Sequence, residues 1–262
     1  MTYEYSYSTE SAFTPSVGWH FFKLRVIPCT NEFQQVSQKQ LTLTPHCRVM
    51  HSIDGQGNAV QWGTLSEVHD KFCVQTQGAV TQIRLYAIHE VPAPYYLTPT
   101  RLTAWNEDLL HVARNIVETR GFDQQQQQHV FEIAADLMHF VHNYLTYSPG
   151  HTTISTTALD AYQDPQGVCQ DYAHLLIALC RSLGIHARYA NGLIAGEGQT
   201  HAWVEVSDGQ VWLPFDPTHN LAPQWGYVKF AHGRDADDCP TNRGRFYCWT
   251  SEQQQVLCRL TT

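Results

Sequence analysis

The amino-acid sequence predicts an α+β protein, in which an N-terminal antiparallel β-sandwich is followed by helices packed on an antiparallel sheet. Alternating apolar and polar residues recur in short segments through roughly the first 90 positions. Prolines then interrupt the chain near residues 90–100, and apolar residues at helical spacing follow. We therefore expect an accessory β-sandwich over residues 1–95 and a core domain over residues 96–262.

Short strands with turn residues between them make up the N-terminal part. Each candidate strand mixes β-branched or aromatic residues with polar ones and stops at Gly, Pro, Asn or Asp. Residues 54–58 are predicted to form one turn, and Gly78-Ala79 a second. Short antiparallel strands at this spacing are typical of a sandwich. The candidate strands are residues 20–27, 40–44, 47–53, 59–65, 71–77 and 80–86.

Helical spacing of apolar residues begins after the prolines. Residues 109–117 form one apolar stripe, and Gly121 follows where a left-handed residue commonly ends a helix. Residues 130–145 form a second stripe. Nearer the C-terminus, residues 239–245 are predicted to be a loop and residues 254–260 a returning strand, because only the latter alternate.

Composition and charge exclude several classes of protein. The 262 residues include 16 Lys+Arg and 24 Asp+Glu, a formal net charge of −8, whereas nucleic-acid binding needs a basic field. No segment approaches the roughly 18 consecutive apolar residues that span a membrane. The start, Met1-Thr2-Tyr3-Glu4-Tyr5, lacks the basic and apolar parts of a secretory signal. We therefore expect a cytoplasmic protein with neither nucleic-acid nor membrane partners.

The eight cysteines are scattered and form no C-x-x-C pair. Structural zinc sites use ligands paired at short spacing, and the chain also lacks a calcium-binding loop of the EF-hand type. In a reducing compartment, scattered cysteines are mostly free thiols. The sequence therefore predicts no metal site and no cofactor.

Cys169 stands at the predicted start of a buried helix. Apolar residues recur at helical spacing from Ala173 to Leu183, and Gly184 follows as a left-handed cap. Unpaired N–H groups and the positive end of the helix dipole favour an anion at such a start, and therefore the thiolate form of Cys169. Taken alone, this helix favours an ordinary buried thiol slightly over a reactive one.

A predicted hairpin supplies a histidine and an aspartate. Asp208-Gly209 lies between two alternating segments, which is a strong two-residue turn signal. With that turn, Glu205 faces Trp212, Trp203 faces Pro214, and His201 faces Asp216. Directly opposite residues have Cβ atoms about 4.5–5.5 Å apart, so an imidazole is predicted beside a carboxylate. The alternatives are a base oriented by an acid, as nucleophilic catalysis requires, or an exposed polar pair.

Four motifs stand out between the start of the predicted helix and the end of the hairpin. They are Gly167-Val168-Cys169-Gln170-Asp171-Tyr172-Ala173-His174, Gly184-Ile185-His186-Ala187-Arg188-Tyr189, Thr200-His201-Ala202-Trp203-Val204-Glu205-Val206 and Phe215-Asp216-Pro217-Thr218. Together these motifs resemble the transglutaminase-like superfamily of papain-type cysteine enzymes. The resemblance implies a helix bearing a catalytic cysteine, here Cys169, packed on an antiparallel sheet bearing a histidine and an aspartate, here His201 and Asp216. The N-terminal β segment, up to about residue 90, resembles the extra domain of bacterial members.

Residues around the triad receive separate predictions. Gln163 and Gln170 are both candidates for the second oxyanion donor, beside the backbone N–H of Cys169. Asp171 is expected to tie the helix start to a neighbour, since a negative charge there would oppose a thiolate. Trp203 is expected near the site in a packing role. Asn220 and its neighbour His219 follow Asp216, and either support of the aspartate or loop hydrogen bonding fits them.

The leading functional hypothesis is cysteine-dependent hydrolysis of a peptide or amide bond, with a peptide or protein as substrate. A second hypothesis is transfer of the acyl group of a protein glutamine to an amine, which cross-links proteins. A third is a non-catalytic binding module that uses the sandwich for recognition. The complete set of Cys169, His201 and Asp216 weighs against the third hypothesis. The oligomeric state stays open.

Overall fold

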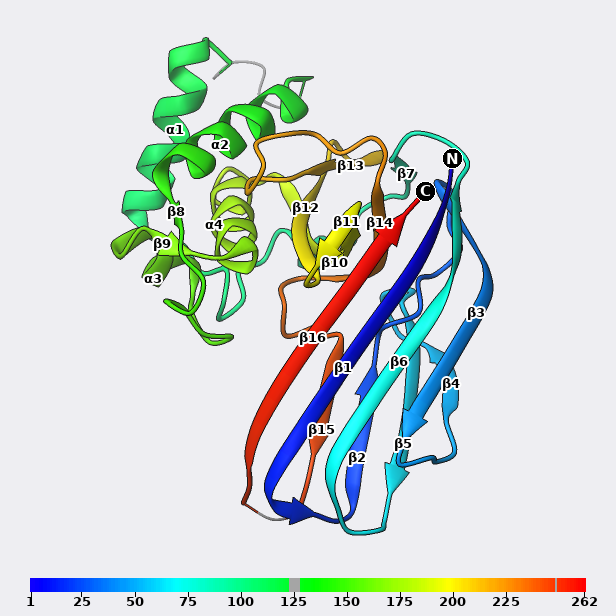
Figure 1. Cartoon of the computed structure of the whole chain (residues 1–262). Helices are drawn as coiled ribbons and strands as arrows, with labels where there is room; N and C mark the ends of the chain where they lie inside the picture. Colours follow the sequence, from blue (N-terminus) through cyan, green and yellow to red (C-terminus); the bar gives the residue numbers. More distant parts are fainter. Residues whose placement is uncertain (123–127, 248) are drawn as a thin grey trace.

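The computed structural model describes residues 1–122, 128–247 and 249–262. Most of the glutamine run at 124–128, and Cys248, therefore lie outside the described residues. A sandwich of long strands stands beside a third sheet, of shorter strands, that is covered on one face by helices (Figure 1). The predicted α+β class is thus confirmed. None of the described helices combines the length and apolar character that crossing a lipid bilayer requires.

Two antiparallel sheets form the sandwich, and aromatic residues fill the space between them. On β1, Tyr3, Tyr5 and Tyr7 point inward while the residues between them are solvent-exposed or partly so, which is the alternation of a half-buried strand. The larger sheet of the sandwich has the strand order β11 (Gly196–Gly198), β16 (Ser251–Thr261), β1 (Thr2–Val17), β6 (His69–Gln82), β3 (Gln34–Thr44). The smaller sheet of the sandwich has the order β15 (Asn242–Arg245), β2 (His20–Leu24), β5 (Ala59–Leu65), β4 (Met50–Ile53).

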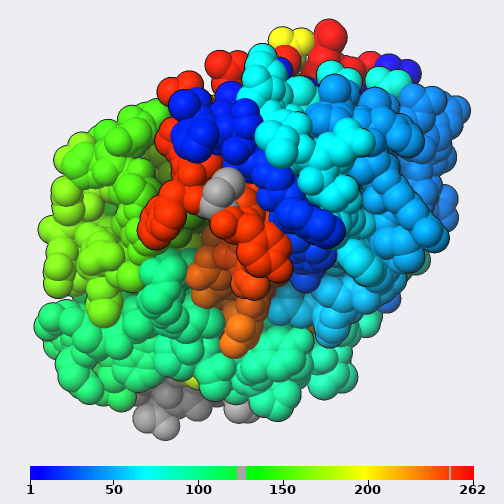
Figure 2. Space-filling view, turned by 90° about the horizontal axis from the view of Figure 1, so that it is seen from below, coloured from blue at the N-terminus to red at the C-terminus, as the bar shows by residue number. Residues whose placement is uncertain are grey.

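The C-terminal strands belong to the sandwich, which corrects the predicted core domain of residues 96–262. β16 pairs with β1 along eleven residues, and β15, predicted to be a loop, pairs with β2. Figure 2 shows this orange and red segment between the blue N-terminal strands and the green helical part. The physical reason is that Cys258 and Leu260 turn inward beside the buried tyrosines of β1. The core is therefore inserted between strands of the sandwich.

Gly78 does not end a strand, although a break was predicted there. β6 runs without interruption through this position. A Cβ atom on Gly78 would lie 2.8 Å from the Tyr5 ring, so the glycine admits an aromatic side chain from the neighbouring strand. Glycine within a strand often marks such a close approach. The predicted segments 71–77 and 80–86 are largely one strand.

The core sheet lies between the helices and the sandwich. The apolar residues Ala202, Val204, Val206 and Phe215 form the face that packs against the helices, as the hairpin pattern predicted. The sheet has the order β14 (Tyr227–Gly233), β10 (His186–Ile194), β12 (His201–Ser207), β13 (Val211–Phe215), β7 (Ile88–His89). The remaining elements are η1 (Pro94–Tyr96), α1 (Glu107–Arg120), α2 (Val130–Tyr144), β8 (Thr146–Tyr147), α3 (Ala158–Gln163), β9 (Gln166–Gly167) and α4 (Cys169–Ser182).

Three buried amide side chains join the sandwich to the free edge of β14. Gln34 donates to the carbonyl of Lys229 at 2.9 Å and accepts from its N–H at 3.0 Å. Gln82 donates to the carbonyl of Tyr227 at 2.8 Å and accepts from the N–H of Gly226 at 2.9 Å. Asn58 likewise donates to the carbonyl of His232 and accepts from its N–H. These side chains therefore pair buried backbone N–H and carbonyl groups at the edge of β14 that would otherwise have no hydrogen-bond partner.

Candidate active site

The start of α4 is held in place by a carboxylate. Asp171 accepts a hydrogen bond from the backbone N–H of Val168 at 2.8 Å and another from the Thr152 hydroxyl at 2.7 Å. A Cβ atom on Gly167 would lie 2.5 Å from the carboxylate, so a glycine is needed there. Burial raises the pKa of Asp171, and these hydrogen bonds oppose that effect. The predicted tying role of Asp171 agrees with these contacts.

Cys169 is the first residue of α4 and is half-buried. Within the described part of the chain, the backbone N–H groups of Cys169 and Gln170 form no hydrogen bond. Unpaired donors at a helix start attract negative charge. The helix ends as predicted, with Gly184 in the left-handed conformation at φ 73°. This position thus offers a thiol next to free N–H donors.

The hairpin after α4 forms, but its register differs from the prediction by two residues. The Asp208 carboxylate accepts from the N–H groups of Gln210 and Val211, and four residues, not two, separate the last pair. Glu205 therefore faces Pro214, where Trp212 was predicted. Because the shift is even, each side chain keeps its face of the sheet.

His201 and Asp216 remain in contact in the new register. The Nε2 atom of His201 lies 2.7 Å from Oδ2 of Asp216. Asp216 is fully buried, and His201 retains 7% exposure. Diagonal neighbours across a strand pair stay within reach of long or aromatic side chains, which explains how the contact survives the shift.

The charge state of the pair follows from its surroundings. Burial alone lowers the pKa of His201, but hydrogen bonds with Asp216 and with Cys169 outweigh it and raise the pKa to about 9. Burial raises the pKa of Asp216, but hydrogen bonds from His201 and His219 hold it well below its usual range. At neutral pH the arrangement therefore favours an imidazolium beside a carboxylate. Since Nε2 faces Asp216, Nδ1 is the ring nitrogen left for the thiol.

Asp216 is also held by residues outside the predicted triad. Its Oδ2 atom lies 2.7 Å from Nδ1 of His219 and accepts from the Tyr227 hydroxyl at 2.6 Å. Its Oδ1 atom accepts from the backbone N–H groups of Thr218 and His219 at 2.9 and 3.2 Å. The sequence offered His219 only as one alternative. Tyr227 was missed because it lies on β14, a strand that no short-range pattern connects to Asp216.

A cleft of about 810 Å³ opens beside Cys169 and His201. The helical part contributes Tyr147, whose pKa is raised by burial and by the nearby Cys169. The other wall comes from the chain between β10 and β12 and from the sandwich. The lining residues are Tyr147, Pro149, Gly150, Val168, Cys169, Ile194–His201, Thr218, His219 and Cys258.

The remaining predicted residues lie away from this cleft lining. Gln163 is exposed at the end of α3, and Gln170 reaches only toward the Ile154 carbonyl at 3.5 Å. Trp203 is fully buried, donates to the Tyr86 hydroxyl at 3.1 Å and packs 6.4 Å from the His201 ring, which is the expected packing role. Asn220 contacts His139 of α2, so its contact is a loop hydrogen bond.

His201, Asp216 and His219 also deserve consideration as metal ligands, since their ligand atoms lie within 4.8 Å of one another. Each imidazole nitrogen, however, stands 2.7 Å from the carboxylate oxygen. Ligands of a tetrahedral zinc ion, with bonds of about 2.0–2.2 Å, stand about 3.3 Å apart or more. The three groups therefore suit one another as hydrogen-bond partners, and we derive no metal chemistry from them.

Two family models match the chain. Residues 118–217 match the transglutaminase-like superfamily, a range that contains Cys169, His201 and Asp216. Residues 3–81 match the bacterial transglutaminase-like N-terminal region. The predicted resemblance is thus confirmed, since the two matched regions are the ones that the motifs and the N-terminal β segment indicated.

The chain is also similar to individual proteins. The crystal structure of a candidate cysteine protease from Cytophaga hutchinsonii has a TM-score of 0.78 and 25% identity, covering 99% of this chain and 90% of that chain. An uncharacterized protein of Mycobacterium leprae is 27% identical, covering 92% of this chain and 91% of the relative. An uncharacterized protein of Mycobacterium tuberculosis is 34% identical over 142 residues, which span 45% of that relative.

Proposed function

We propose that this protein is an enzyme that hydrolyses peptide or amide bonds through a cysteine nucleophile. The observation that carries the proposal is the position of His201, which is hydrogen-bonded to Asp216 and lines the same cleft as Cys169, whose proximity also raises the pKa of His201. An imidazole between a thiol and an orienting carboxylate is the arrangement that activates a cysteine. The cleft beside these residues gives a substrate access to the thiol.

In the first half of the reaction, the Cys169 thiolate attacks the carbonyl carbon and forms a C–S bond. His201, held as an imidazolium by Asp216, donates its proton to the leaving nitrogen as the C–N bond breaks. An amine departs and a thioester remains on Cys169. The free N–H of Cys169 lies at the helix start, where it can donate to the developing oxyanion.

In the second half, His201 accepts a proton from water as the water oxygen attacks the thioester. The C–S bond breaks, the acid departs, and the thiolate–imidazolium pair is restored. A primary amine in place of water would give a new amide by the same steps. The nature of the product therefore distinguishes hydrolysis from the cross-linking activity considered above.

The second oxyanion donor is proposed to be the Tyr147 hydroxyl. Tyr147 lines the cleft, and its pKa responds to the charge of Cys169, so the phenol lies in the electrostatic field of the reacting sulfur. Neither Gln163 nor Gln170 lines the cleft. A phenol is a suitable donor because its pKa, already raised by burial, keeps it protonated.

Thiol alkylation tests the proposal without knowledge of the substrate. Iodoacetamide labelling at pH 7 is followed peptide by peptide with mass spectrometry, in the wild type and in His201→Ala. Burial raises the pKa of Cys180 and of Cys258 to about 12, and it also raises those of Cys29, Cys47, Cys73 and Cys239. Cys169 is therefore expected to label fastest in the wild type, and more slowly in His201→Ala.

The half-buried Cys47 is the internal control, because its labelling should be the same in both proteins. Cleavage of an unfolded protein such as reduced, carboxymethylated lactalbumin is then measured with and without a primary amine. Equal labelling of Cys169 and Cys47 in both proteins would overturn the proposal and favour a binding module. Labelling as expected, with incorporation of the amine in place of cleavage, would replace hydrolysis by transamidation.

A further inference from the structure

β11 is an edge strand whose outer side has no partner. It pairs with β16 through Gly196, Glu197 and Gly198 and stands last in the order of the sheet. In the part of the chain that the structure describes, the backbone of these three residues makes no hydrogen bond beyond those with β16. All three are exposed. An unpaired strand edge is a template for another extended segment.

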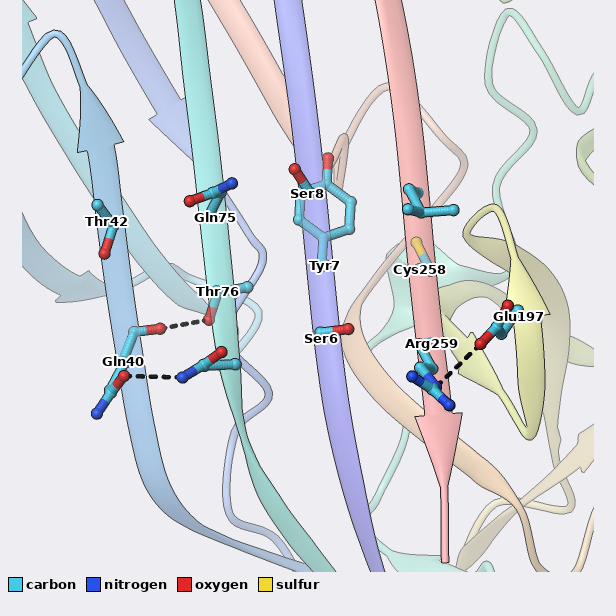
Figure 3. A pocket seen from close by; sticks show the side chains of 12 residues that line it. Ser6, Tyr7, Ser8, Gln40, Thr42, Gln75, Thr76, Glu197, Cys258 and Arg259 are labelled. Carbon is cyan, nitrogen blue, oxygen red and sulfur yellow. Dashed lines mark hydrogen bonds and ion pairs between the residues drawn. The ribbon is translucent and has the colours of Figure 1, made fainter.

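β11 is short, as protected edge strands often are, but it carries little else that would block pairing along its outer side. Two of its three residues are glycines, and a Cβ atom on either would meet nothing within 4 Å. The one charged side chain, Glu197, turns back over β16 and forms an ion pair with Arg259 at 3.0 Å, as Figure 3 shows. It lies there beside a polar hollow on the outer face of the sheet. The edge itself is therefore left without a side chain over it.

This bare edge belongs to the wall of the candidate active-site cleft. Gly196, Glu197 and Gly198 line the same cleft as Cys169 and His201. The chain continues from β11 directly to His201 at the start of β12. Any polypeptide that pairs with β11 is thus led along the wall toward the thiol.

We propose that the substrate is an extended polypeptide segment that binds by adding a strand to the outer edge of β11. Main-chain hydrogen bonds to the edge would supply affinity and alignment, and would present one carbonyl of the segment to Cys169. This inference rests on the proposed acyl-transfer function and narrows its substrate class. Unfolded chains and flexible loops fit this binding mode, whereas small amides without neighbouring peptide groups do not.

Hydrogen exchange tests the binding mode without catalysis. The Cys169→Ala variant of the full chain is mixed with excess reduced, carboxymethylated lactalbumin, and amide exchange is followed by mass spectrometry. Amides within residues 196–198 are expected to exchange at least several-fold more slowly when the probe is present. Acetamide at the same concentration is the control and should leave exchange unchanged. Slower exchange elsewhere in the cleft, with residues 196–198 unaffected, would overturn the inference.

Proline substitution tests the same edge by kinetics. Of two adjacent strand residues, one points its N–H outward and the other toward β16. Glu197→Pro and Gly198→Pro are each compared with Glu197→Ala and Gly198→Ala, which keep the N–H. At the outward position, proline should lower kcat/KM for the lactalbumin probe about tenfold relative to alanine. Two proline variants as active as their alanine controls would contradict strand addition, even if Cys169 is reactive.

Discussion

His201 contacts Asp216 across the hairpin from a diagonal position, not from the position directly opposite. The pairs Glu205–Pro214 and Val204–Phe215 set the register, so Asp216 comes opposite Trp203 when the ladder is continued. The imidazole Nε2 nevertheless lies 2.7 Å from the carboxylate. Asp216 is kept there by its other donors, which leads to predictions about each of them.

Asp216→Asn should reduce kcat by about 1,000-fold or more, because an amide cannot stabilise the imidazolium or select its tautomer. Iodoacetamide labelling of Cys169 should slow in parallel. Asp238→Asn is the control, since Asp238 is likewise a hydrogen-bonded carboxylate but its donors are Arg234 and Gln56. Normal labelling of Cys169 in Asp216→Asn would show that the carboxylate does not activate the site.

Tyr227→Phe removes one donor from Asp216 and keeps the aromatic packing on Trp203. Loss of a hydrogen bond to a charged group should cost about 1.5–3 kcal/mol of stability. We also expect a fall in kcat, because Asp216 loses its link to β14. Tyr86→Phe is the control: its buried hydroxyl donates to Glu205 at 2.6 Å and accepts from Trp203 at 3.1 Å. Urea unfolding should show at least as large a loss in Tyr86→Phe as in Tyr227→Phe, with kcat lowered more in Tyr227→Phe.

His219→Ala should lower kcat several-fold with little change in KM. The half-exposed His219 side chain contributes little to burial, so thermal unfolding should shift only slightly. His219→Asn places an amide donor close to the position of Nδ1 and should restore most of the activity. Asn220→Gly, which removes the contact with His139 and keeps a residue that readily adopts the positive φ of 54° found there, is the control. A positioning role for His219 is refuted if the alanine and asparagine variants have the same kcat.

Raising the pH should inactivate the enzyme as His201 loses its proton. The folded-state pKa of about 9 lies above the ordinary value of about 6.5. The stabilisation from the imidazolium is therefore complete below about pH 6.5 and is lost as the pH rises through about 9. Both kcat and the stability difference between wild type and His201→Gln should fall over this window. A stability difference that is constant from pH 6 to 10 would contradict the assignment.

Gln82→Leu should lower both stability and kcat. The substitution leaves the N–H of Gly226 and the carbonyl of Tyr227 unpaired, at about 1–3 kcal/mol for each buried group. It also loosens the residue whose hydroxyl holds Asp216. Gln34→Leu removes the same two types of bond at Lys229, together with a third to the Cys29 carbonyl, and serves as the control. We expect at least as large a loss in urea unfolding for Gln34→Leu and a kcat effect in Gln82→Leu alone; equal kcat values would refute the link.

Local patterns predicted the parts of the site that depend on local chemistry. The helix start at Cys169, its end at Gly184 and the two faces of the hairpin follow from spacing and turn residues. The predicted register of the hairpin was wrong by two residues, because the side chain of Asp208 caps a wider loop than the Asp-Gly pair suggests. An even shift preserves the faces, so the error left His201 and Asp216 on the same side.

Long-range contacts were beyond such patterns. Tyr227 meets Asp216 only because β14 pairs with β10, and Gln82 meets Tyr227 only because the sandwich packs on that edge. A turn is predicted at Gly78 because the side chain that requires a glycine there, Tyr5, comes from another strand. Nothing in the alternation of the last strand indicates that its partner is the first one.

Because β16 follows the catalytic residues in the sequence, the cleft is completed only after those residues have been synthesised. Cys169, His201 and Asp216 leave the ribosome before residues 251–261, which anchor β11 and bring Cys258 to the cleft. Until that strand is translated, β11 lacks its partner strand in the sandwich. The wall of the cleft is therefore completed after the catalytic residues themselves, because β11 takes its place only once β16 has been made.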